Sequence, residues 1–212
     1  MKQALNIKLG SYCSTIENEF NLIDGTRKKE LESLADYVGR SLQKKRRINL
    51  IFVCTHNSRR SQLAQVWFKV AAEYYGVRGI ATFSGGTEVS EVNIRVIGSL
   101  ERAGITIECL NPYQPNPVYN AVIGEGYEGL ELFSKVYNDP ANPDNNYCAV
   151  MVCSDADEAC PNVPGADLRI AIPYTDPKYS DNSPAEADIY DTASRTIARE
   201  MFYAISLITK IQ

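Results

Sequence analysis

The feature that most constrains the fold is a short apolar segment that runs straight into a polar turn and then into an amphipathic stretch. Residues 48–53 are almost entirely apolar and rich in β-branched and aromatic side chains, which is typical of a strand buried on both faces. Residues 54–60 are polar, and from Ser61 apolar residues recur at helical spacing until Gly76. A strand, a turn and a helix in this order predict a unit of a parallel α/β sheet.

The same alternation repeats along the chain. Further strands are expected at residues 79–83, 149–152 and 168–172, and further helices at residues 93–103 and 192–208. This order predicts an α/β fold, a three-layer doubly wound sheet of four parallel strands. Such sheets place their sites at the carboxyl ends of the strands. Because Cys54 follows the first predicted strand and Cys153 the third, we expect both thiols at the same edge.

Residues 1–47 form a predicted N-terminal helical extension to the main domain. Leu31, Leu34 and Val38 recur at helical spacing between charged residues. Thr26 is the expected cap of that helix.

Residues 48–212 form the predicted main domain, with an insertion at about 110–147 that interrupts the strand–helix rhythm. Several Asn-Pro and Asp-Pro pairs mark this insertion as irregular. Two of its segments, 118–123 and 132–137, are candidates for a β-hairpin.

Composition excludes several classes of protein. The net charge of −4 argues against a nucleic-acid partner, because phosphate backbones recruit basic faces. The sequence contains no run of about 18 apolar residues that would span a membrane, and the first ten residues lack the apolar core of a secretory signal. We therefore expect a cytoplasmic protein, in which the six cysteines stay reduced.

The turn after the first strand has the composition of an oxyanion-binding loop. It reads Cys54, Thr55, His56, Asn57, Ser58, Arg59, Arg60 and Ser61. The amides of the loop and the start of the following helix attract a tetrahedral anion. Arg60 can hold two oxygens of that anion at once. The same positive field favours the thiolate of Cys54, which is then placed for in-line attack.

The remaining side chains of the loop suggest supporting roles. Ser61 can donate a hydrogen bond to the sulfur or to the leaving group. Arg59 adds positive charge, which we expect to tighten anion binding. His56 is the only histidine of the chain, so neither a His-based dyad nor a His-rich metal site competes with this interpretation.

The loop from Cys54 to Ser61 resembles the phosphate loop of the low-molecular-weight protein tyrosine phosphatase superfamily. The resemblance implies a four-stranded parallel sheet and a general acid on a late Asp-Pro loop. Asp176-Pro177 matches that loop in composition and position. Asp176 would protonate the leaving oxygen and then activate water.

A second pair of cysteines, Cys153 and Cys160, lies in the segment CSDADEACP. The residues alone leave open two buried cysteines, half of a zinc site or a coincidence. Zinc is disfavoured, because a structural site needs about four ligands and the chain offers one histidine. Simple core packing remains the alternative for Cys13, Cys109 and Cys148.

This segment closely resembles the redox segment of the thioredoxin-coupled arsenate reductases, which share the phosphatase fold. The resemblance implies that Cys54 attacks arsenate and that Cys153 then attacks the Cys54 sulfur, which releases arsenite. Cys160 would take over the oxidation in a Cys153–Cys160 disulfide, and thioredoxin would reduce it. Thioredoxin is then the electron donor, and no bound cofactor is implied.

The resemblance also raises the question of a potassium ion near the loop. Asn57 and Ser84 match two positions associated with potassium in the reductases. Gln65, however, stands where a glutamate is usual, and the final aspartate ligand has no clear counterpart. The site residues that we predict therefore include no metal ligand.

Three functions follow from these residues. The first is a thioredoxin-coupled arsenate reductase that uses Cys54, Arg60, Cys153, Cys160 and Asp176. The second is a phosphatase acting on phosphotyrosine proteins or small phosphoesters, which needs only Cys54, Arg60 and Asp176. The third is a non-enzymatic module that binds an anion or senses oxidation. The cysteine pair favours the reductase.

Overall fold

The centre of the protein is a parallel sheet of four strands. The computed structural model describes residues 4–159 and 162–209. The strands are β2 (Ile48–Cys54), β3 (Ile80–Gly86), β8 (Tyr147–Met151) and β9 (Ala166–Ala171). Their order is β3-β2-β8-β9, and all three pairings are parallel. The predicted four-stranded parallel sheet is confirmed.

The strand β2 is central because nearly all of it is apolar. Every residue of β2 except Asn49 is buried. On one side it pairs with β3, from Ile48 opposite Ile80 to Cys54 opposite Gly86. On the other side it pairs with β8. The predicted nucleophile thus stands at the carboxyl end of an inner strand, where this type of fold places its sites.

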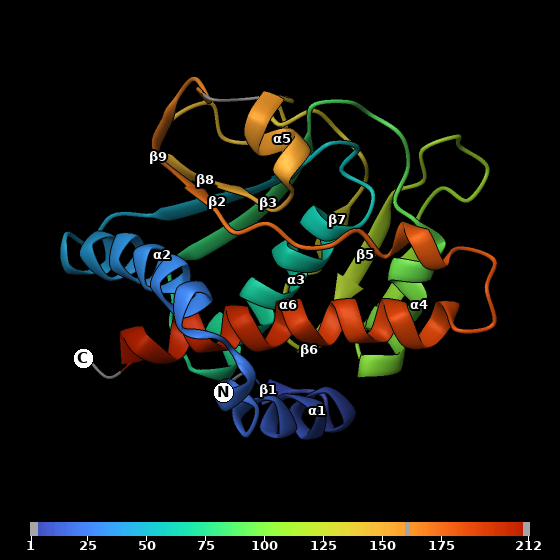
Figure 1. Cartoon of the computed structure of the whole chain (residues 1–212), viewed down its shortest axis with the longest axis horizontal. Coiled ribbons are helices and arrows are strands. Elements are labelled where there is room, and N and C mark those ends of the chain that lie inside the picture. Colours follow the sequence, from blue (N-terminus) through green and yellow to red (C-terminus); the bar gives the residue numbers. More distant parts are fainter. Residues whose placement is uncertain (1–3, 160–161, 210–212) are drawn as a thin grey trace.

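Helices cover both faces of the sheet (Figure 1). The helices α2 (Gly25–Gln43), α3 (Arg60–Tyr74) and α6 (Glu186–Thr209) lie on one side, and the short α5 (Ser154–Ala159) lies on the other. Next to α6 lie α4 (Ile94–Ala103) and α1 (Ile7–Glu17). Two 3₁₀ turns, η1 (Phe20–Leu22) and η2 (Pro177–Ser180), complete the helical elements. Within the described ranges, no helix has both the length and the apolarity to cross a membrane.

The predicted helical extension is present as α1 and α2, and it shares the core of the sheet domain. Leu9 and Cys13 of α1 and Leu31 and Leu34 of α2 are fully buried in the same apolar cluster as the sheet. The predicted cap was wrong by two residues. Asp24 caps α2 by accepting from the amides at positions 26 and 27, because a carboxylate one residue before the helix reaches these donors best.

The insertion builds a second, antiparallel sheet from β4 (Thr106–Cys109), β5 (Tyr119–Val122) and β7 (Leu130–Leu132), in that order. The predicted hairpin is found only in part: β5 corresponds to its first segment, but β7, which pairs with β5, shares only Leu132 with the predicted second segment. It is wrong in extent, because β7 ends at Leu132 and residues 133–137 contact the end of β3 and the Cys54 loop instead. The short β6 (Gly124–Glu125) pairs with β1 (Ala4–Leu5) of the extension.

The predicted second strand ended too early. It continues through Ser84, Gly85 and Gly86, because glycine allows other backbones to approach there. A Cβ atom on Gly85 would lie 2.3 Å from Cα of Tyr137, and one on Gly86 would lie 2.6 Å from the carbonyl oxygen of Thr55. The closing helix also begins earlier than predicted, at Glu186.

We expect Gly85→Ala to destabilise the protein, because the added Cβ meets main-chain atoms that cannot rotate away. Overpacking of this kind costs about 1–3 kcal/mol of unfolding free energy. The matched control is Gly39→Ala in α2, where a Cβ meets no atom of the described chain within 4 Å. That change should stabilise by about 0.5–1 kcal/mol, because alanine favours a helix over glycine. Denaturant unfolding of both variants tests this, and equal midpoints would contradict the close packing.

Candidate active site

The loop from Thr55 to Arg59 connects the central strand β2 to the first turn of α3. Cys54 ends the strand with 3% of its surface exposed, and Arg60 begins the helix. The neighbouring backbone supports the loop, since the Thr87 amide donates to the Cys54 carbonyl and the Glu88 amide to the Thr55 carbonyl. The thiol and the positive end of α3 therefore converge, and this arrangement suits an oxyanion.

The Cys54 sulfur accepts a hydrogen bond whose direction follows from its neighbours. Ser61 Oγ lies 3.1 Å from Cys54 Sγ. The Oδ1 atom of Asn57 accepts from the Lys135 amide at 3.0 Å, which directs the Nδ2 atom to Ser61 Oγ at 2.8 Å. Because Ser61 Oγ accepts from Asn57, its own proton is available to Cys54. A hydroxyl that donates to the sulfur stabilises the thiolate.

Asn57 therefore serves to hold the loop together. It is fully buried and has a left-handed backbone with φ of 48°, a conformation that asparagine tolerates better than most residues. Its carbonyl accepts from Gln62 Nε2 at 2.9 Å. Asn57 was predicted to be an anion ligand, whereas its side chain forms hydrogen bonds with Ser61 and with the Lys135 amide.

Arg60 joins the loop to the predicted acid. Its Nη2 atom lies 2.8 Å from Oδ2 of Asp176, and its Nη1 atom donates to the Tyr174 carbonyl at 3.1 Å. The Asp176 carboxylate also accepts from the Lys178 amide and so caps the turn η2. The structure thus brings Asp176, which is more than a hundred residues away in the sequence, to Arg60 at the end of the Cys54 loop.

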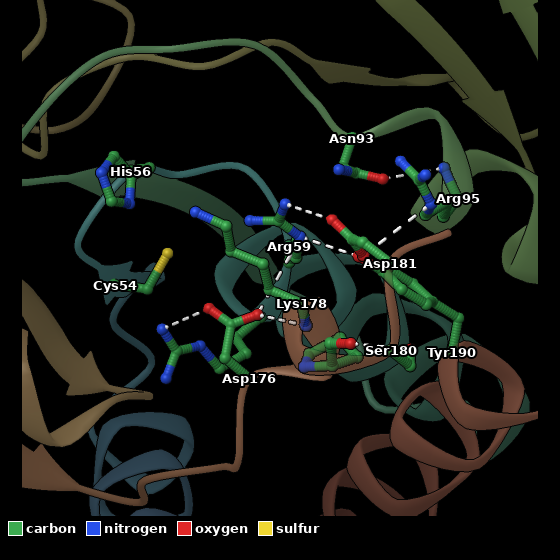
Figure 2. Close-up of polar contacts among 12 residues, drawn as sticks. Cys54, His56, Arg59, Asn93, Arg95, Asp176, Lys178, Ser180, Asp181 and Tyr190 are labelled. Carbon is green, nitrogen blue, oxygen red and sulfur yellow. Dashed lines mark hydrogen bonds and ion pairs between the residues drawn. The ribbon is translucent and has the colours of Figure 1, made fainter. Parts of the chain in front are cut away.

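Arg59 makes contacts different from those expected of an extra anion ligand. Its Nε atom donates to the Tyr190 hydroxyl at 2.9 Å, and its Nη2 atom lies 3.4 Å from Asp181 Oδ2. The Tyr190 hydroxyl in turn donates to Asp181, whose carboxylate also lies near Arg95 (Figure 2). Arg59 Nε is 3.9 Å from Asp176 as well. This arginine therefore links the loop to α6 and to the segment that carries Asp176.

The insertion forms hydrogen bonds to the Cys54 loop and to the end of β3, a role that the sequence did not predict. Ser134 Oγ donates to the His56 carbonyl at 2.8 Å, and the Lys135 carbonyl accepts from the Gly86 amide at 2.8 Å. Asn116 holds Ser134 in place through two hydrogen bonds to its backbone. These residues belong to no recognisable sequence motif. They reach the loop because β7 ends at Leu132 and the chain then leaves the antiparallel sheet.

Lys135 also places a buried amine beside the site. Its side chain is packed over the Phe133 ring at 4.1 Å, and 4% of the residue is exposed. Burial lowers the pKa of the Lys135 ammonium to about 8, against the pull of the Asp139 and Glu131 carboxylates. The buried Lys135 amine is therefore deprotonated more easily than an exposed lysine.

Cys153 lies beside the loop, two positions after β8. Its sulfur is 3.6 Å from Thr55 Oγ1 and accepts from the Ala156 amide at 3.3 Å. The residue is fully buried. The Val152 amide donates to the carbonyl of Val53, so Cys153 and the Cys54 loop lie at the same edge of the sheet, as predicted. Cys160, its predicted partner, lies outside the described residues.

Two other cysteines have the character of packing residues. Burial raises the pKa of the Cys13 and Cys148 thiols to about 12, so both remain protonated at neutral pH. Cys109 lies half-buried on β4 in the insertion.

His56 and Ser58 contribute mainly backbone to the loop. The His56 imidazole is about half exposed and lies 3.3 Å from the Glu88 carboxylate on the surface. The Ser58 carbonyl accepts from the Asn93 amide at the start of α4. The two residues therefore tie the loop to neighbouring segments through their carbonyls.

Of the positions compared with potassium ligands, Asn57 has its side-chain oxygen on a backbone amide, whereas the Ser84 hydroxyl and the Gln65 side-chain oxygen are buried without a hydrogen-bond partner among the described residues. Asn57 Oδ1 accepts from the Lys135 amide, and Asn57 Nδ2 donates to Ser61 Oγ. Gln65 contributes a neutral oxygen where a carboxylate is usual. Within residues 4–159 and 162–209, no group of three or more His, Cys, Asp and Glu side chains could hold a metal ion. We derive no step through a metal.

Comparisons with known proteins agree with this geometry. Residues 49–120 match the family described as low molecular weight phosphotyrosine protein phosphatase. The chain is 30% identical over 116 residues to an arsenate reductase of Staphylococcus aureus, which covers 54% of this chain and 67% of that protein. It is 28% identical over 129 residues to arsenate reductase 2 of Staphylococcus epidermidis, with coverage of 60% and 77%. A low molecular weight protein tyrosine phosphatase from Bacillus subtilis has the same fold, with a TM-score of 0.52, 16% identity and coverage of 78% and 99%.

The two arginines of the loop should differ sharply in anion binding. Arg60→Met removes two hydrogen bonds to a charged ligand, at about 1.5–3 kcal/mol each, and should weaken phosphate binding at least ~100-fold. Arg59→Met should weaken it far less, because that guanidinium is directed to Tyr190 and Asp181. Calorimetric titration with inorganic phosphate measures both. Equal losses would show that Arg59 binds the anion directly.

Proposed function

The chain belongs to the low-molecular-weight protein tyrosine phosphatase superfamily, a superfamily of enzymes, and on this basis we propose that it is a thioredoxin-coupled arsenate reductase. The observation that carries the proposal is the position of Cys153. Its thiol lies 3.6 Å from Thr55, the residue that follows the nucleophile. A hydrolytic phosphatase needs no second thiol there, whereas a reductase requires one. The names of the two staphylococcal relatives support the same choice.

In the first step, the oxyanion binds over Cys54. Arsenate and phosphate are both tetrahedral, and Arg60 can hold two of their oxygens. To do so, the Arg60 fork exchanges its contacts with Asp176 and Tyr174 for contacts with the anion. The Cys54 thiolate attacks arsenic and a sulfur–arsenic(V) bond forms. Asp176 gives a proton to the departing hydroxide, which leaves as water.

In the second step, the arsenic is reduced. The Cys153 thiolate attacks the Cys54 sulfur, the sulfur–arsenic bond breaks, and its electron pair stays on arsenic, which leaves as arsenite. The two sulfurs lose two electrons and form a disulfide. The Ala156 amide, which donates to the Cys153 sulfur, helps to stabilise its thiolate before the attack.

In the third step, Cys160 attacks Cys153 and releases Cys54 as a thiolate, which leaves a Cys153–Cys160 disulfide. Cys153 has to react with Cys54 first and with Cys160 afterwards, and it is fully buried. The proposed sequence of steps therefore requires α5 to rearrange. The helix has only six residues, and helices this short are marginal by themselves. Arg169, which holds Asp157 of α5, would have to release it. Thioredoxin supplies the two electrons that restore the thiols.

A phosphatase remains the second candidate, and the position of Asp176 favours it. Arg60 and the Lys178 amide hold the carboxylate next to the Cys54 loop. A general acid has to be close to the leaving ester oxygen, which this position allows. Such an enzyme would hydrolyse phosphotyrosine or aryl phosphates through a phosphocysteine at Cys54. Cys153 and Cys160 would then be dispensable.

One set of assays separates the two. Arsenate, thioredoxin, thioredoxin reductase and NADPH are supplied and NADPH oxidation is followed, while aryl phosphate hydrolysis is measured in parallel. We expect arsenate turnover to fall to background in Cys54→Ser and Cys153→Ser. Hydrolysis of the aryl phosphate should be lost only in Cys54→Ser.

The matched control is Cys109→Ser, because Cys109 is a half-buried thiol on the insertion strand β4. It should keep both activities. Turnover of the aryl phosphate with no arsenate reduction, unaffected by Cys153→Ser, would establish the phosphatase instead.

A further inference from the structure

The side chain of Arg27 connects the N-terminal extension to the segment that carries Asp176. This residue lies in the first turn of α2, where the carboxylate of Asp24 accepts from its amide. The guanidinium donates to the carbonyl of Pro173 and lies 3.4 Å from the carboxylate of Glu200 on α6. It also lies over the ring of Tyr174, 5.2 Å from the centroid. Arg27 thus contacts the two residues that precede Thr175 and Asp176.

We propose that Arg27 is a positioning residue of the active site, through which the N-terminal extension holds the segment that carries Asp176 above Cys54. The proposal rests on the proposed function, since it assigns Asp176 a role in proton transfer. It gives residues 1–47 a part in the reaction in addition to their part in the core.

The need for such a brace follows from the contacts of Arg60. At present Arg60 holds the segment through the Tyr174 carbonyl and the Asp176 carboxylate. Both contacts are given up when Arg60 turns to an oxyanion. The contacts of Pro173 and Tyr174 that remain include the Tyr174 amide on the Val152 carbonyl, the Tyr174 side chain against Glu200, and Arg27 on the Pro173 carbonyl. Arg27 therefore matters most when the substrate is bound.

The chemistry of the contact requires arginine. Pro173 has no amide hydrogen, so its carbonyl is the group by which the backbone can be held there. The guanidinium serves Pro173, Glu30 and Glu200 from three separate nitrogens, Nη2, Nη1 and Nε. An ammonium carries all its donors on one atom and cannot reproduce this spread. The Tyr174 hydroxyl, at the end of the ring beneath the guanidinium, is buried next to Glu200.

Glu200 complicates the obvious variant. Its side chain is 7% exposed, and burial raises the pKa of its carboxyl while the charge of Arg27 acts against this. Removing Arg27 alone would leave a buried carboxylate without its closest cation, which destabilises a fold for reasons unrelated to positioning. The double variant Arg27→Met with Glu200→Gln removes both charges and avoids this.

The test compares the full-length protein with the double variant, with Arg27→Lys and with the control Arg40→Met. Arg40 lies on the same helix, pairs with Asp36 and is largely exposed. Steady-state kinetics with arsenate and with an aryl phosphate give kcat and KM. In the double variant kcat should fall ~10–100-fold, since a misplaced proton donor costs about that much. Phosphate affinity should change little, because Arg60 and the loop are intact.

The remaining variants sharpen the outcome. Arg27→Lys should recover part of kcat, and Arg40→Met should retain all of it. Hydrogen exchange of the backbone amides at 174–178, measured well below each unfolding temperature, should accelerate in the double variant and stay unchanged in Arg40→Met. A parallel loss of kcat and phosphate affinity, or unchanged kcat and exchange, would overturn the brace. If the unmodified protein turns over neither substrate, the proposed function fails, and the exchange comparison still decides the brace.

Discussion

The structure of the site depends on one hydrogen-bonded chain that runs from Lys135 through Asn57 and Ser61 to Cys54. Because the Lys135 amide can only donate, it determines which way the Asn57 amide faces, and Asn57 in turn directs the Ser61 proton to the sulfur. These hydrogen bonds join the insertion to the Cys54 loop, and the loop to the sulfur of Cys54, the proposed nucleophile. Without them, a loop with a left-handed residue at position 57 would lack its main internal support.

The insertion and the N-terminal extension both contact the segments that carry the proposed working groups of the site. The insertion fixes the loop beside Cys54 through Ser134 and Lys135. The extension contacts the segment that carries Asp176 through Arg27. The parallel sheet brings the ends of β2, β8 and β9 together, but these additional elements hold the loops that follow the strands. The active site is therefore a product of the whole chain.

The sequence could predict the sheet and the thiol because both depend on local patterns. The apolar run of β2 and the spacing from Cys54 to Arg60 are visible without tertiary information. The end of β7 was mispredicted because tertiary contacts decide it: the residues after Leu132 bind the loop. The cap of α2 is instead a local choice between neighbouring residues, in which Asp24 accepts from the first amides ahead of Thr26. The direction of Arg59 could not be predicted, since Tyr190 and Asp181, its partners, are more than a hundred residues away.

We propose that the thiols of this chain supply the two electrons that reduce arsenic. A single-turnover experiment tests it directly: fully reduced protein is mixed with an equal amount of arsenate, without thioredoxin, and arsenite, free thiols and disulfide-linked peptides are measured. We expect about one arsenite per chain, with two of the six thiols lost and Cys153 linked to Cys160. Absence of arsenite with all six thiols intact would contradict it.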